Sequence, residues 1–363
     1  MWSQQDQMHM DQALSLAELG RGQTSPNPMV GAVVVSDHEQ VVGTGYHSRA
    51  GESHAEVVAL NEAGKRARDG TLYCTLEPCS HQGRTGPCAV RVVNAGIRRV
   101  VLGMSDPNPL VSGNGIAYLR EHGLDVQVGL RQEAVERLTE AFRVWVTRGR
   151  PFVTMKVALS QDGKVAARPG ERTRLTSVQA QREVQRMRAE VVAIGIGSTT
   201  LLVDNPRLTV RGVQRARPFT RVVFDRRLRM RVTARLIGTL EEGPIVVITT
   251  PSGLTSQPIV AEQLSEVGVQ LETIPNLGSG LDVALNLLGS LNITSLLLEG
   301  GTTIHQAAWD GGLVDRLQRF VAPVDLGQGG VAWLDVPDSA LSDLSVRQLG
   351  PDVLTDGYVY RVN

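Results

Sequence analysis

The chain has 363 residues, which is long for one average domain and sufficient for two. Lys+Arg and Asp+Glu both number 37, and this neutral balance argues against a protein that binds long nucleic acid, which usually has a basic excess. No run reaches the roughly 20 apolar residues of a membrane span, and the polar first residues have no apolar signal core. We therefore expect a cytoplasmic protein with a small-molecule substrate and neither a nucleic-acid nor a membrane partner.

The first half alternates between helical and strand-like periods, which predicts α/β layers. Strands are expected at 30–35, 41–46, 71–75, 99–103 and 125–128, and the first two form a hairpin. Helices are expected at 7–19, 54–68, 88–95, 113–122 and 131–146. A helix stop, two basic residues and a proline follow at 147–151, which predicts two domains, 1–147 and 151–363.

The second half continues the alternation and predicts a largely parallel sheet. Strands are expected at 152–159, 191–196, 221–224, 244–249, 269–274 and 294–298, with further β-like runs at 317–322 and 358–362. Helices are expected at 177–188, 258–266 and 280–289, a Gly/Pro-bearing turn at 162–170 and an exposed loop at 211–221.

Four residues of the first half form a pattern typical of zinc deaminases. His54 and Glu56 begin a helix, Cys79 follows a strand, and Cys88 comes nine residues later. An imidazole and two thiolates fill three tetrahedral positions of zinc and leave the fourth for water, whose pKa the metal lowers to about 7. Glu56, two residues from a ligand, is placed to transfer protons without binding the metal.

A closed structural zinc site is the alternative interpretation, with His81 as a fourth ligand. That assignment would leave no role for Glu56, which lies two residues from the ligand His54. The eight-residue stretch between Cys79 and Cys88 exceeds the C-x-x-C spacing of deaminases in general and must form a loop. Cys74, in the middle of a predicted strand, is expected to be a small buried apolar residue.

The second half lacks the Gly-x-Gly-x-x-Gly dinucleotide fingerprint. Polar or glycine residues instead follow three apolar runs, at 156–163, 204–211 and 298–301, and ligands bind at the carboxyl ends of strands in open α/β sheets. The turn at 299–305 could hold a phosphate with its free N–H groups. Lys156 and Asp162 are also compatible with a strand-end ion pair or a turn cap.

Five motifs follow one another in the first half: Pro26–Gly31, Gly45–Gly51, His54–Glu56, Thr75–His81 and Asp106–Pro109. Together with the three segments of the second half, they resemble the bifunctional riboflavin-biosynthesis deaminase/reductase family over nearly the whole chain. The resemblance implies a cytidine-deaminase-like three-layer α/β/α domain followed by a dihydrofolate-reductase-like α/β domain. It also implies hydrolytic deamination of 2,5-diamino-6-(5-phosphoribosylamino)pyrimidin-4-one and NADPH-dependent reduction of its ribosyl group to ribityl.

The resemblance assigns residues to each site. In the deaminase, Zn²⁺ is held by His54, Cys79 and Cys88 and Glu56 is catalytic; the substrate is contacted by Asn27, His47, His81, Arg84, Asp106 and Asn108. Loop-stabilising hydrogen bonds are the alternative role for Asn27 and Asp106, because both lie among turn-forming residues. In the reductase, the expected cofactor contacts are Ala158, Arg174, Thr200, Asp204, Gly301, Thr302, Thr303, Ile304, His305, Gln306 and Ala307. The expected reductase substrate contacts are Arg172, Arg188, Leu208, Arg211 and Glu299.

The chain departs from the family pattern after Gly170. Where the common bacterial members have Ser-x-Trp-Ile-Thr, this chain has Arg172-Thr-Arg-Leu-Thr176, and Arg226 replaces a serine. An arginine cannot repeat a neutral hydroxyl contact, but it can bind a phosphate with two parallel hydrogen bonds. Thr173 is the nearest substitute for the missing hydroxyl.

Two further interpretations remain at this point. The second half could bind a phosphoribosyl ligand without reducing it, as a binding or assembly module. The first half could be a cytidine or tRNA-adenosine deaminase, although the neutral charge argues against tRNA and the long Cys79–Cys88 loop against a free nucleoside. Family resemblance also implies a homo-oligomer, a dimer or tetramer built through the reductase half.

Overall fold

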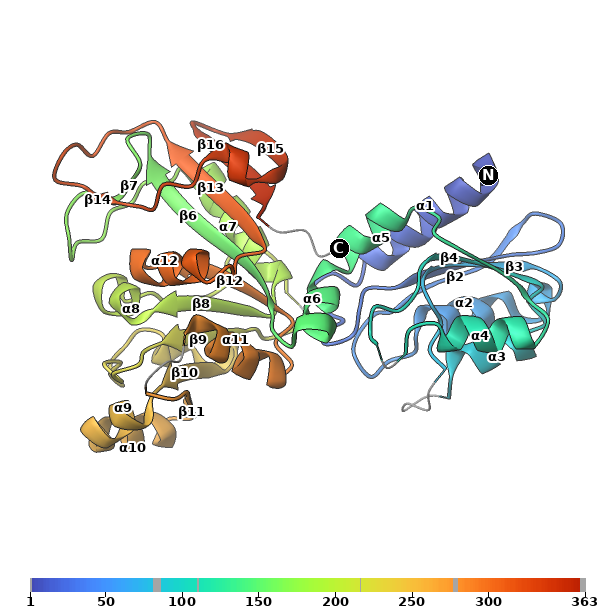
Figure 1. Ribbon diagram of the computed structural model, residues 1–363, viewed down its shortest axis with the longest axis horizontal. Coiled ribbons are helices and arrows are strands. Elements are labelled where there is room, and N and C mark those ends of the chain that lie inside the picture. The colour runs from blue at the N-terminus through green and yellow to red at the C-terminus, as the bar shows by residue number, and fades with distance from the viewer. Residues whose placement is uncertain (1, 81–85, 110, 216, 277–279, 360–363) are drawn as a thin grey trace. The chain divides into compact units, whose positions relative to one another are not determined.

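The computed structural model describes residues 2–80, 86–109, 111–215, 217–276 and 280–359. The chain forms two compact units, Met1–Gly149 and Arg150–Asn363, called here the N-terminal and C-terminal units (Figure 1). In the described residues, no helix is long and apolar enough to cross a membrane.

The N-terminal unit is built on a five-stranded sheet of order β2-β1-β3-β4-β5. The strands are β1 (Gly31–Val35), β2 (Val41–Tyr46), β3 (Thr71–Leu76), β4 (Arg99–Met104) and β5 (Asp125–Val128). The helices are α1 (Gln4–Glu18), α2 (Ala55–Ala63), α3 (Cys88–Asn94), α4 (Asn114–Glu121), α5 (Gln132–Leu138) and α6 (Glu140–Arg148). β1 is antiparallel to both of its neighbours, whereas β3, β4 and β5 run parallel.

Helices cover both faces of this sheet, so the unit has three layers (Figure 1). Alternate side chains of β1 point to opposite faces, as the period of a strand requires. Ala32 and Val34 join the core under α2, α3 and α4, while Val33 and Val35 pack with Met10 of α1. The N-terminal unit thus has the α/β/α architecture that the family resemblance implies.

A buried polar network holds α1 against this sheet. The carboxylate of Asp6, whose side chain is 7% exposed, accepts hydrogen bonds from the Tyr73 hydroxyl (2.8 Å) and the Arg99 guanidinium (2.7 Å). Burial alone would raise the pKa of Asp6, but the donors from Arg99, Tyr73 and Ser3 outweigh it and hold that pKa well below its ordinary value. Asp6 therefore stabilises the folded unit in its charged form.

We expect Asp6→Asn to lower the free energy of unfolding of the N-terminal unit by about 2 kcal/mol at pH 7, because it removes a charge-assisted hydrogen-bond acceptor. The folded-state pKa is depressed, so the stabilisation is present above the unfolded-state value near 4 and is lost as pH falls below it. Denaturant titrations at pH 7 and pH 3 should show the difference from wild type shrinking at pH 3. Asp11→Asn is the control, because Asp11 on the same helix forms an exposed pair with Arg131. A difference that grows at pH 3 would contradict this role of Asp6.

The C-terminal unit contains a nine-stranded sheet of order β11-β10-β9-β8-β12-β6-β13-β16-β15, and a separate ribbon of β7 and β14. The strands are β6 (Phe152–Ser160), β7 (Lys164–Ala166), β8 (Ala193–Gly197), β9 (Thr220–Phe224), β10 (Ile245–Thr249), β11 (Gln270–Thr273), β12 (Ser295–Gly300), β13 (Arg316–Ala322), β14 (Val331–Ala332), β15 (Ser342–Leu349) and β16 (Asp352–Tyr358). Neighbours from β11 to β13 are parallel, and β16 and β15 add an antiparallel edge.

Helices pack on both faces of the larger sheet. They are α7 (Val178–Glu190), α8 (Ser198–Asp204), α9 (Pro251–Ser256), α10 (Pro258–Glu266), α11 (Leu281–Ser290) and α12 (Thr302–Asp310). Apolar residues of α11 and α12 share one core with β6 and β12, whereas Leu201 of α8 and Leu264 of α10 pack with Ile194 and Val247 in another. Both cores flank the sheet, and the carboxyl ends of β6, β8 and β12 are left to form a site.

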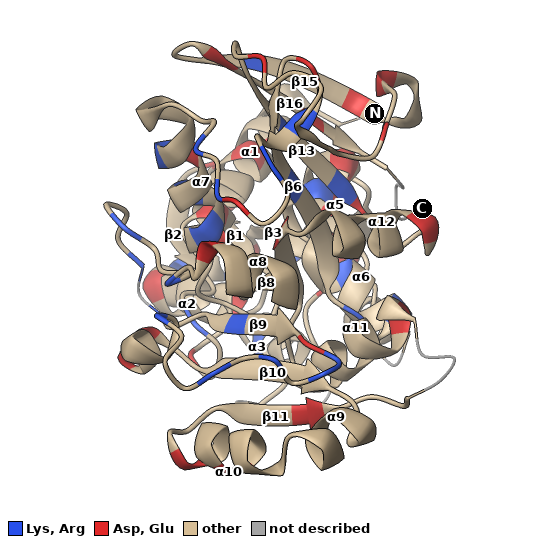
Figure 2. Ribbon diagram, turned by 90° about the vertical axis from the view of Figure 1, so that its left-hand side faces the viewer, with Lys and Arg blue, Asp and Glu red and all other residues tan. Residues whose placement is uncertain are grey.

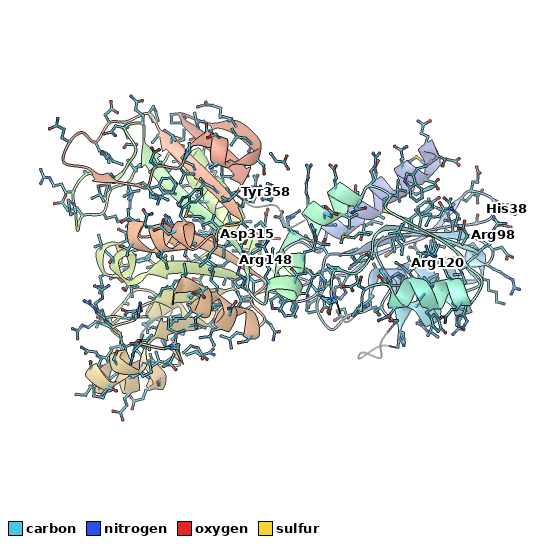
Figure 3. All side chains as sticks on the ribbon, in the orientation of Figure 1. His38, Arg98, Arg120, Arg148, Asp315 and Tyr358 are labelled. Atoms are coloured by element: carbon cyan, nitrogen blue, oxygen red, sulfur yellow. The ribbon has the colours of Figure 1, made fainter. Side chains whose placement is uncertain are left out.

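A fully buried carboxylate anchors the start of β6. Asp315, labelled in Figure 3, precedes β13 and accepts two hydrogen bonds from Arg150, at 2.6 and 2.8 Å. It also accepts the backbone N–H of Val153 at 2.8 Å. Because a buried charge needs such partners, this pair fixes how the chain enters the C-terminal sheet.

Several predicted elements differ from the structure, each for a local reason. The helix expected at 131–146 is two helices, which meet at Thr139, a residue with non-helical backbone angles (φ −104°, ψ 11°). The helix expected at 54–68 ends at Ala63, because Gly64 adopts positive φ. The strand expected at 358–362 was misplaced: β16 ends at Tyr358, and residues 360–363 lie outside the described part of the chain. The turn at 162–170 contains β7, and α12 begins within the strand-to-helix turn expected at 299–305, whereas α8, α9, β14 and β15 were not predicted.

Candidate active sites

Three potential metal ligands meet in the N-terminal unit. His54 is the N-terminal cap residue of α2, Cys88 is the first residue of α3, and Cys79 lies three residues beyond the end of β3. Nδ1 of His54 lies 3.6 Å from Sγ of Cys79 and 3.3 Å from Sγ of Cys88. All three ligand atoms lie within 4.8 Å of one another. The packing of α2 and α3 beside the end of β3 therefore brings together three side chains that are far apart along the chain.

The donor set fits zinc. With Zn–N near 2.05 Å and Zn–S near 2.3 Å, the N···S edge of a tetrahedron is roughly 3.6 Å, close to the observed separations. The thiol of Cys88 and the imidazole of His54, acting against burial, hold the pKa of Cys79 below its ordinary value, which favours the thiolate that binds metal. His54, Cys79 and Cys88 thus form a three-ligand set with room for a fourth, non-protein ligand.

Glu56 lies in the first turn of α2, two residues after His54, and is 3% exposed. Burial raises the pKa of its carboxyl to about 7. A carboxyl with a pKa near neutrality can both accept and donate a proton at physiological pH. Position and environment together suit Glu56 for proton transfer beside the three ligands.

Asn27 and His47 form a pair next to this site. The side-chain amide of Asn27 donates to Nε2 of His47 at 3.1 Å, and Nδ1 of His47 donates to the carbonyl of Ser53 at 3.2 Å. The His47 ring stands edge-on to that of His54, with the centroids 5.3 Å apart. Burial lowers the pKa of His47, which favours the neutral imidazole. These bonds fix the orientation of both side chains at the zinc-ligand cluster.

The other predicted deaminase contacts are placed differently. Asp106 and Asn108 form a turn after β4, in which Oδ1 of Asp106 accepts the backbone N–H of Asn108 at 2.8 Å. This bond supports the loop-stabilising interpretation of Asp106 without testing a substrate contact. His81 and Arg84 lie outside the described residues.

The C-terminal unit contains a cavity of about 1000 Å³. This volume is at the upper end of the roughly 300–1,000 Å³ typical of ligand pockets. The cavity lies where β6, β8 and β12 end and α8 and α12 begin, and β7 and β14 contribute to its wall. Cavities at the carboxyl ends of parallel strands are the usual ligand sites of α/β sheets.

Positive charge dominates the cavity. Among the described residues, nine Lys or Arg side chains line it against three acidic ones; Figure 2 marks the basic residues on the ribbon, including those of β6 and α7. Two glycines line the cavity just before α12: Gly301 has φ +96°, and a Cβ on Gly300 would press on the Thr200 side chain. Such glycines let the backbone approach a phosphate closely at a helix N-terminus. The cavity therefore suits a ligand that carries phosphate groups.

Comparisons with known proteins agree with this division into two sites. The cytidine and deoxycytidylate deaminase zinc-binding region matches residues 3–104, and the RibD C-terminal domain matches residues 151–355. The riboflavin biosynthesis protein RibD of Aquifex aeolicus is 39% identical over 95% of this chain and 92% of its own. That of Escherichia coli is 39% identical over 96% and 98%. The structure of Acinetobacter baumannii RibD has a TM-score of 0.88 at 35% identity, covering 98% of this chain and 99% of its own.

The chain belongs to the RibD family. As a RibD-family enzyme it is bifunctional, with a zinc-dependent deaminase in the N-terminal unit and an NADPH-dependent reductase in the C-terminal unit. The expected cytidine-deaminase-like and dihydrofolate-reductase-like folds are confirmed. The reading of the second half as a non-reducing binding module is not favoured, because this half matches the family's reductase domain.

Most of the reductase residues expected from the RibD resemblance line the cavity, and the exceptions lie on α12. Those that line it are Ala158, Arg172, Arg174, Arg188, Thr200, Asp204, Leu208, Arg211, Glu299, Gly301, Thr302 and His305. Those absent from the lining are Thr303, Ile304, Gln306 and Ala307; Ile304 instead packs in the core and Gln306 donates to Asp310. The helical period explains the difference, because it turns only some of the residues after Gly301 toward the cavity.

Arg188 and Glu299 bind each other inside the RibD reductase cavity. The guanidinium of Arg188 donates to both carboxylate oxygens of Glu299, at 2.5 and 2.7 Å, and to the carbonyl of Thr209 at 3.0 Å. Burial opposes ionisation of Glu299, but Arg188 outweighs it and lowers the pKa of Glu299. A phosphate contact by Arg188 stays a prediction, and it would have to use the remaining N–H groups.

The substituted arginines occupy different places. Arg172 and Arg174 line the cavity and are exposed, which leaves them accessible to a charged ligand. Arg226 is absent from the lining and donates to the carbonyl of Asn276 at 2.6 Å. The Thr173 hydroxyl accepts the backbone N–H of Ala167 at 2.8 Å.

Lys156 and Trp333 line the cavity but were not among the predicted contacts. Lys156, on β6, is half-buried, and burial together with the nearby charge of Arg188 lowers its pKa. Trp333, just after β14, donates from Nε1 to Nδ1 of His305 at 3.1 Å, and Nε2 of His305 donates to the carbonyl of Leu298. Burial lowers the pKa of His305 to about 4, consistent with a neutral ring. Lys156 could have been found from the sequence, because it begins the 156–163 segment in which polar residues follow an apolar run. No motif near Trp333 in the sequence indicated that it lines the cavity.

Proposed function

We propose that this enzyme deaminates a diaminohydroxyphosphoribosylaminopyrimidine and then reduces 5-amino-6-(5-phosphoribosylamino)uracil. These are the two activities in the name of a Thermotoga maritima relative, which is 32% identical with a TM-score of 0.83 over 98% of both chains. The observation that carries the proposal is one chain holding a His54–Cys79–Cys88 cluster with Glu56 beside it and a separate arginine-lined cavity.

For the deaminase, we assign metal binding to His54, Cys79 and Cys88. Bound zinc supplies a Lewis acid that makes water a nucleophile at neutral pH. Glu56 accepts a proton from the attacking water, delivers a proton to the pyrimidine ring nitrogen, and transfers one to the departing ammonia. The exocyclic amine and water thereby become a carbonyl and ammonia. Asn27 and His47, held by their mutual hydrogen bond, orient the pyrimidine or its ribose.

For the reductase, we assign cofactor binding to Thr200 and the Gly301 turn, and phosphate binding to the arginines of the cavity. Bound NADPH supplies the hydride that opens the ribosyl ring to ribityl. Thr200 and the Gly301 turn hold the cofactor, while Arg172, Arg174 and Arg211 offer cationic groups to the phosphates of cofactor and substrate. Glu299, fixed by Arg188, faces the sugar hydroxyls.

A coupled assay tests both activities in one chain. The deaminase substrate is incubated with NADPH, and the reduced-cofactor absorbance and ammonia release are followed together. We expect one NADPH oxidised for each ammonia released. Ammonia release with no NADPH oxidation would overturn the reductase half, and neither signal would overturn both assignments. Cytidine serves as the negative control, and its conversion to uridine would overturn the substrate assignment.

Removal of zinc should separate the two activities. We expect chelation to abolish ammonia release, while NADPH oxidation with the deaminated intermediate continues, because the reductase cavity contains none of the three ligands. Re-addition of Zn²⁺ should restore deamination. Ammonia release that persists in demonstrably zinc-free protein would contradict the metal assignment.

We also infer a homo-oligomer, a dimer or tetramer through the C-terminal unit, acting in the cytoplasm. Support for association comes from β15, an edge strand on which Val346 is 62% exposed and Leu344 41%. Support for the compartment comes from the free thiols at positions 79 and 88, which a reducing environment preserves. Light scattering should give a dimeric or tetrameric mass, and a monomer at micromolar concentration would contradict the inferred association. Cell fractionation should find the protein in the cytoplasm, and its recovery in a membrane fraction would contradict the inferred compartment.

A further inference from the structure

Glu77 lies between the end of β3 and the zinc ligand Cys79, and its side chain is buried. Its two carboxylate oxygens accept four backbone N–H groups from one other segment. Oε2 accepts from Asp106 (2.9 Å) and Gly113 (3.0 Å), and Oε1 accepts from Gly115 (2.8 Å) and Ile116 (3.1 Å). One side chain thus satisfies both ends of the connection between β4 and α4.

This carboxylate ties the connection to the end of β3. Within the connection, Asn108 donates its N–H to Asp106 Oδ1, and the Asn108 carbonyl accepts from Val111 and Ser112. Those bonds shape the turn, and both partners of each lie within the connection. Glu77 supplies a four-bond attachment to the end of β3, and its carboxylate lies at the N-terminus of α4, where the helix dipole favours an anion.

A close backbone contact completes the junction. A Cβ on Gly115 would overlap the carbonyl oxygen of Pro78, the residue between Glu77 and Cys79. The first turn of α4 therefore packs directly on the peptide that leads to the zinc ligand. The backbone of Glu77 also donates to the carbonyl of Met104 at the end of β4. The Cys79 segment is therefore joined to Asp106 on one side of the connection and to residues 113–116 on the other.

We propose that Glu77 is a positioning residue of the deaminase, which fixes the Asp106–Asn108 turn relative to the zinc ligands and so presets the substrate pocket. The proposal rests on the proposed function, in which this turn borders the pyrimidine or its phosphoribosyl group. Loss of the attachment leaves the turn distributed among positions of which only a fraction binds substrate. Apparent affinity falls by the same fraction, so a competent population of 1–10% raises KM by about 10–100-fold.

The test is Glu77→Gln in the full chain. The glutamine amide keeps the size of the side chain but presents an NH₂ group to two of the four N–H donors, which it cannot accept. We expect KM for deamination to rise about 10–100-fold, with kcat changed by less than about threefold. Zinc content and NADPH-dependent reduction of the deaminated intermediate should equal wild type, and they report that both units are folded.

Glu121→Gln is the matched control, because Glu121 is exposed at the other end of α4. It should leave KM and kcat unchanged. An unchanged KM in Glu77→Gln, with zinc and reduction intact, would overturn the proposal. Zinc loss from a variant that still reduces the intermediate would also overturn it, since Glu77 would then support the metal and not the turn.

Hydrogen exchange on the wild-type protein keeps the proposal testable if Glu77→Gln fails to fold. We expect the amides of Asp106, Gly113, Gly115 and Ile116 to exchange as slowly as those of β3 and β4. Fast exchange at these four amides would overturn the attachment. If the wild-type protein does not turn over the pyrimidine substrate, the proposed function fails. Slow exchange at the four amides would even then establish that Glu77 holds this connection.

Discussion

Glu56→Gln should lower kcat for deamination by about 10²–10⁴-fold while zinc stays bound and NADPH-dependent reduction continues. Glutamine keeps the size and polarity of the side chain, but its amide cannot take a proton from water and return it to the ring nitrogen or to ammonia. Glu56 is 3% exposed in the first turn of α2, and burial raises the pKa of its carboxyl to about 7. Both properties suit a group that must be ionised and protonated in turn within one reaction.

The comparison requires zinc analysis, ammonia release and the reductase assay on the same preparation. Glu62→Gln is the control, because Glu62 lies on the exposed face of the same helix and its carboxylate accepts hydrogen bonds from Thr44. We expect Glu62→Gln to deaminate like wild type. If Glu56→Gln deaminates at the wild-type rate, Glu56 does not transfer the proton. If Glu56→Gln loses zinc, Glu56 instead supports the metal.

Arg188→Leu should lower the free energy of unfolding of the C-terminal unit by about 3–5 kcal/mol. The substitution leaves the Glu299 carboxylate, whose side chain is 8% exposed, without the guanidinium that binds both its oxygens. A buried charge that loses its partner either stays ionised at a high cost or takes up a proton. Lys156 also lowers the pKa of Glu299, but no hydrogen bond or ion pair joins the two side chains among the described contacts. The rate of NADPH-dependent reduction should fall as well, because Arg188 and Glu299 both line the cavity.

Denaturant unfolding with a spectroscopic probe of the C-terminal unit measures this loss. Arg186→Leu is the control: Arg186 is two residues earlier on α7, its side chain is 64% exposed, and its ion-pair partner Glu183 keeps a second partner in Arg347 when Arg186 is removed. Such pairs are worth only about 0–1 kcal/mol. A loss in Arg188→Leu no larger than that in Arg186→Leu would show that the Arg188–Glu299 pair does not stabilise the fold.

Short motifs made the zinc site predictable. His54 and Glu56 are two residues apart, so the start of one helix places both. Cys79 follows the end of a strand, and Cys88 begins a helix. Strand and helix periods likewise indicated most of the elements in both units. Boundaries failed where single residues break a helix, as Gly64 and Thr139 do, because backbone angles at one residue do not change the hydrophobic period.

The reductase cavity was only partly predictable. The glycine turn and the arginines after Gly170 pointed to phosphate binding through local chemistry, and the resemblance supplied the remaining contacts. The cavity wall formed by β7, β14 and Trp333 had no local signal, because Trp333 reaches His305 from 28 positions away. All residues from Gly301 to Ala307 were predicted to contact the cofactor. In a helix, however, consecutive residues point in different directions, so some side chains of α12 are buried and others are exposed.

By itself, the sequence determined the residue types and spacing of the zinc ligands, the acid beside them, and the two α/β halves, since these depend on neighbours within a few turns of chain. The tertiary structure alone decided which distant groups become partners. It pairs Asn27 with His47, Arg188 with Glu299, and Glu77 with four amides of the 105–116 segment. The physical reason is that a buried charge or polar group must find its partner where the fold brings one, and that place is set by packing of the whole unit.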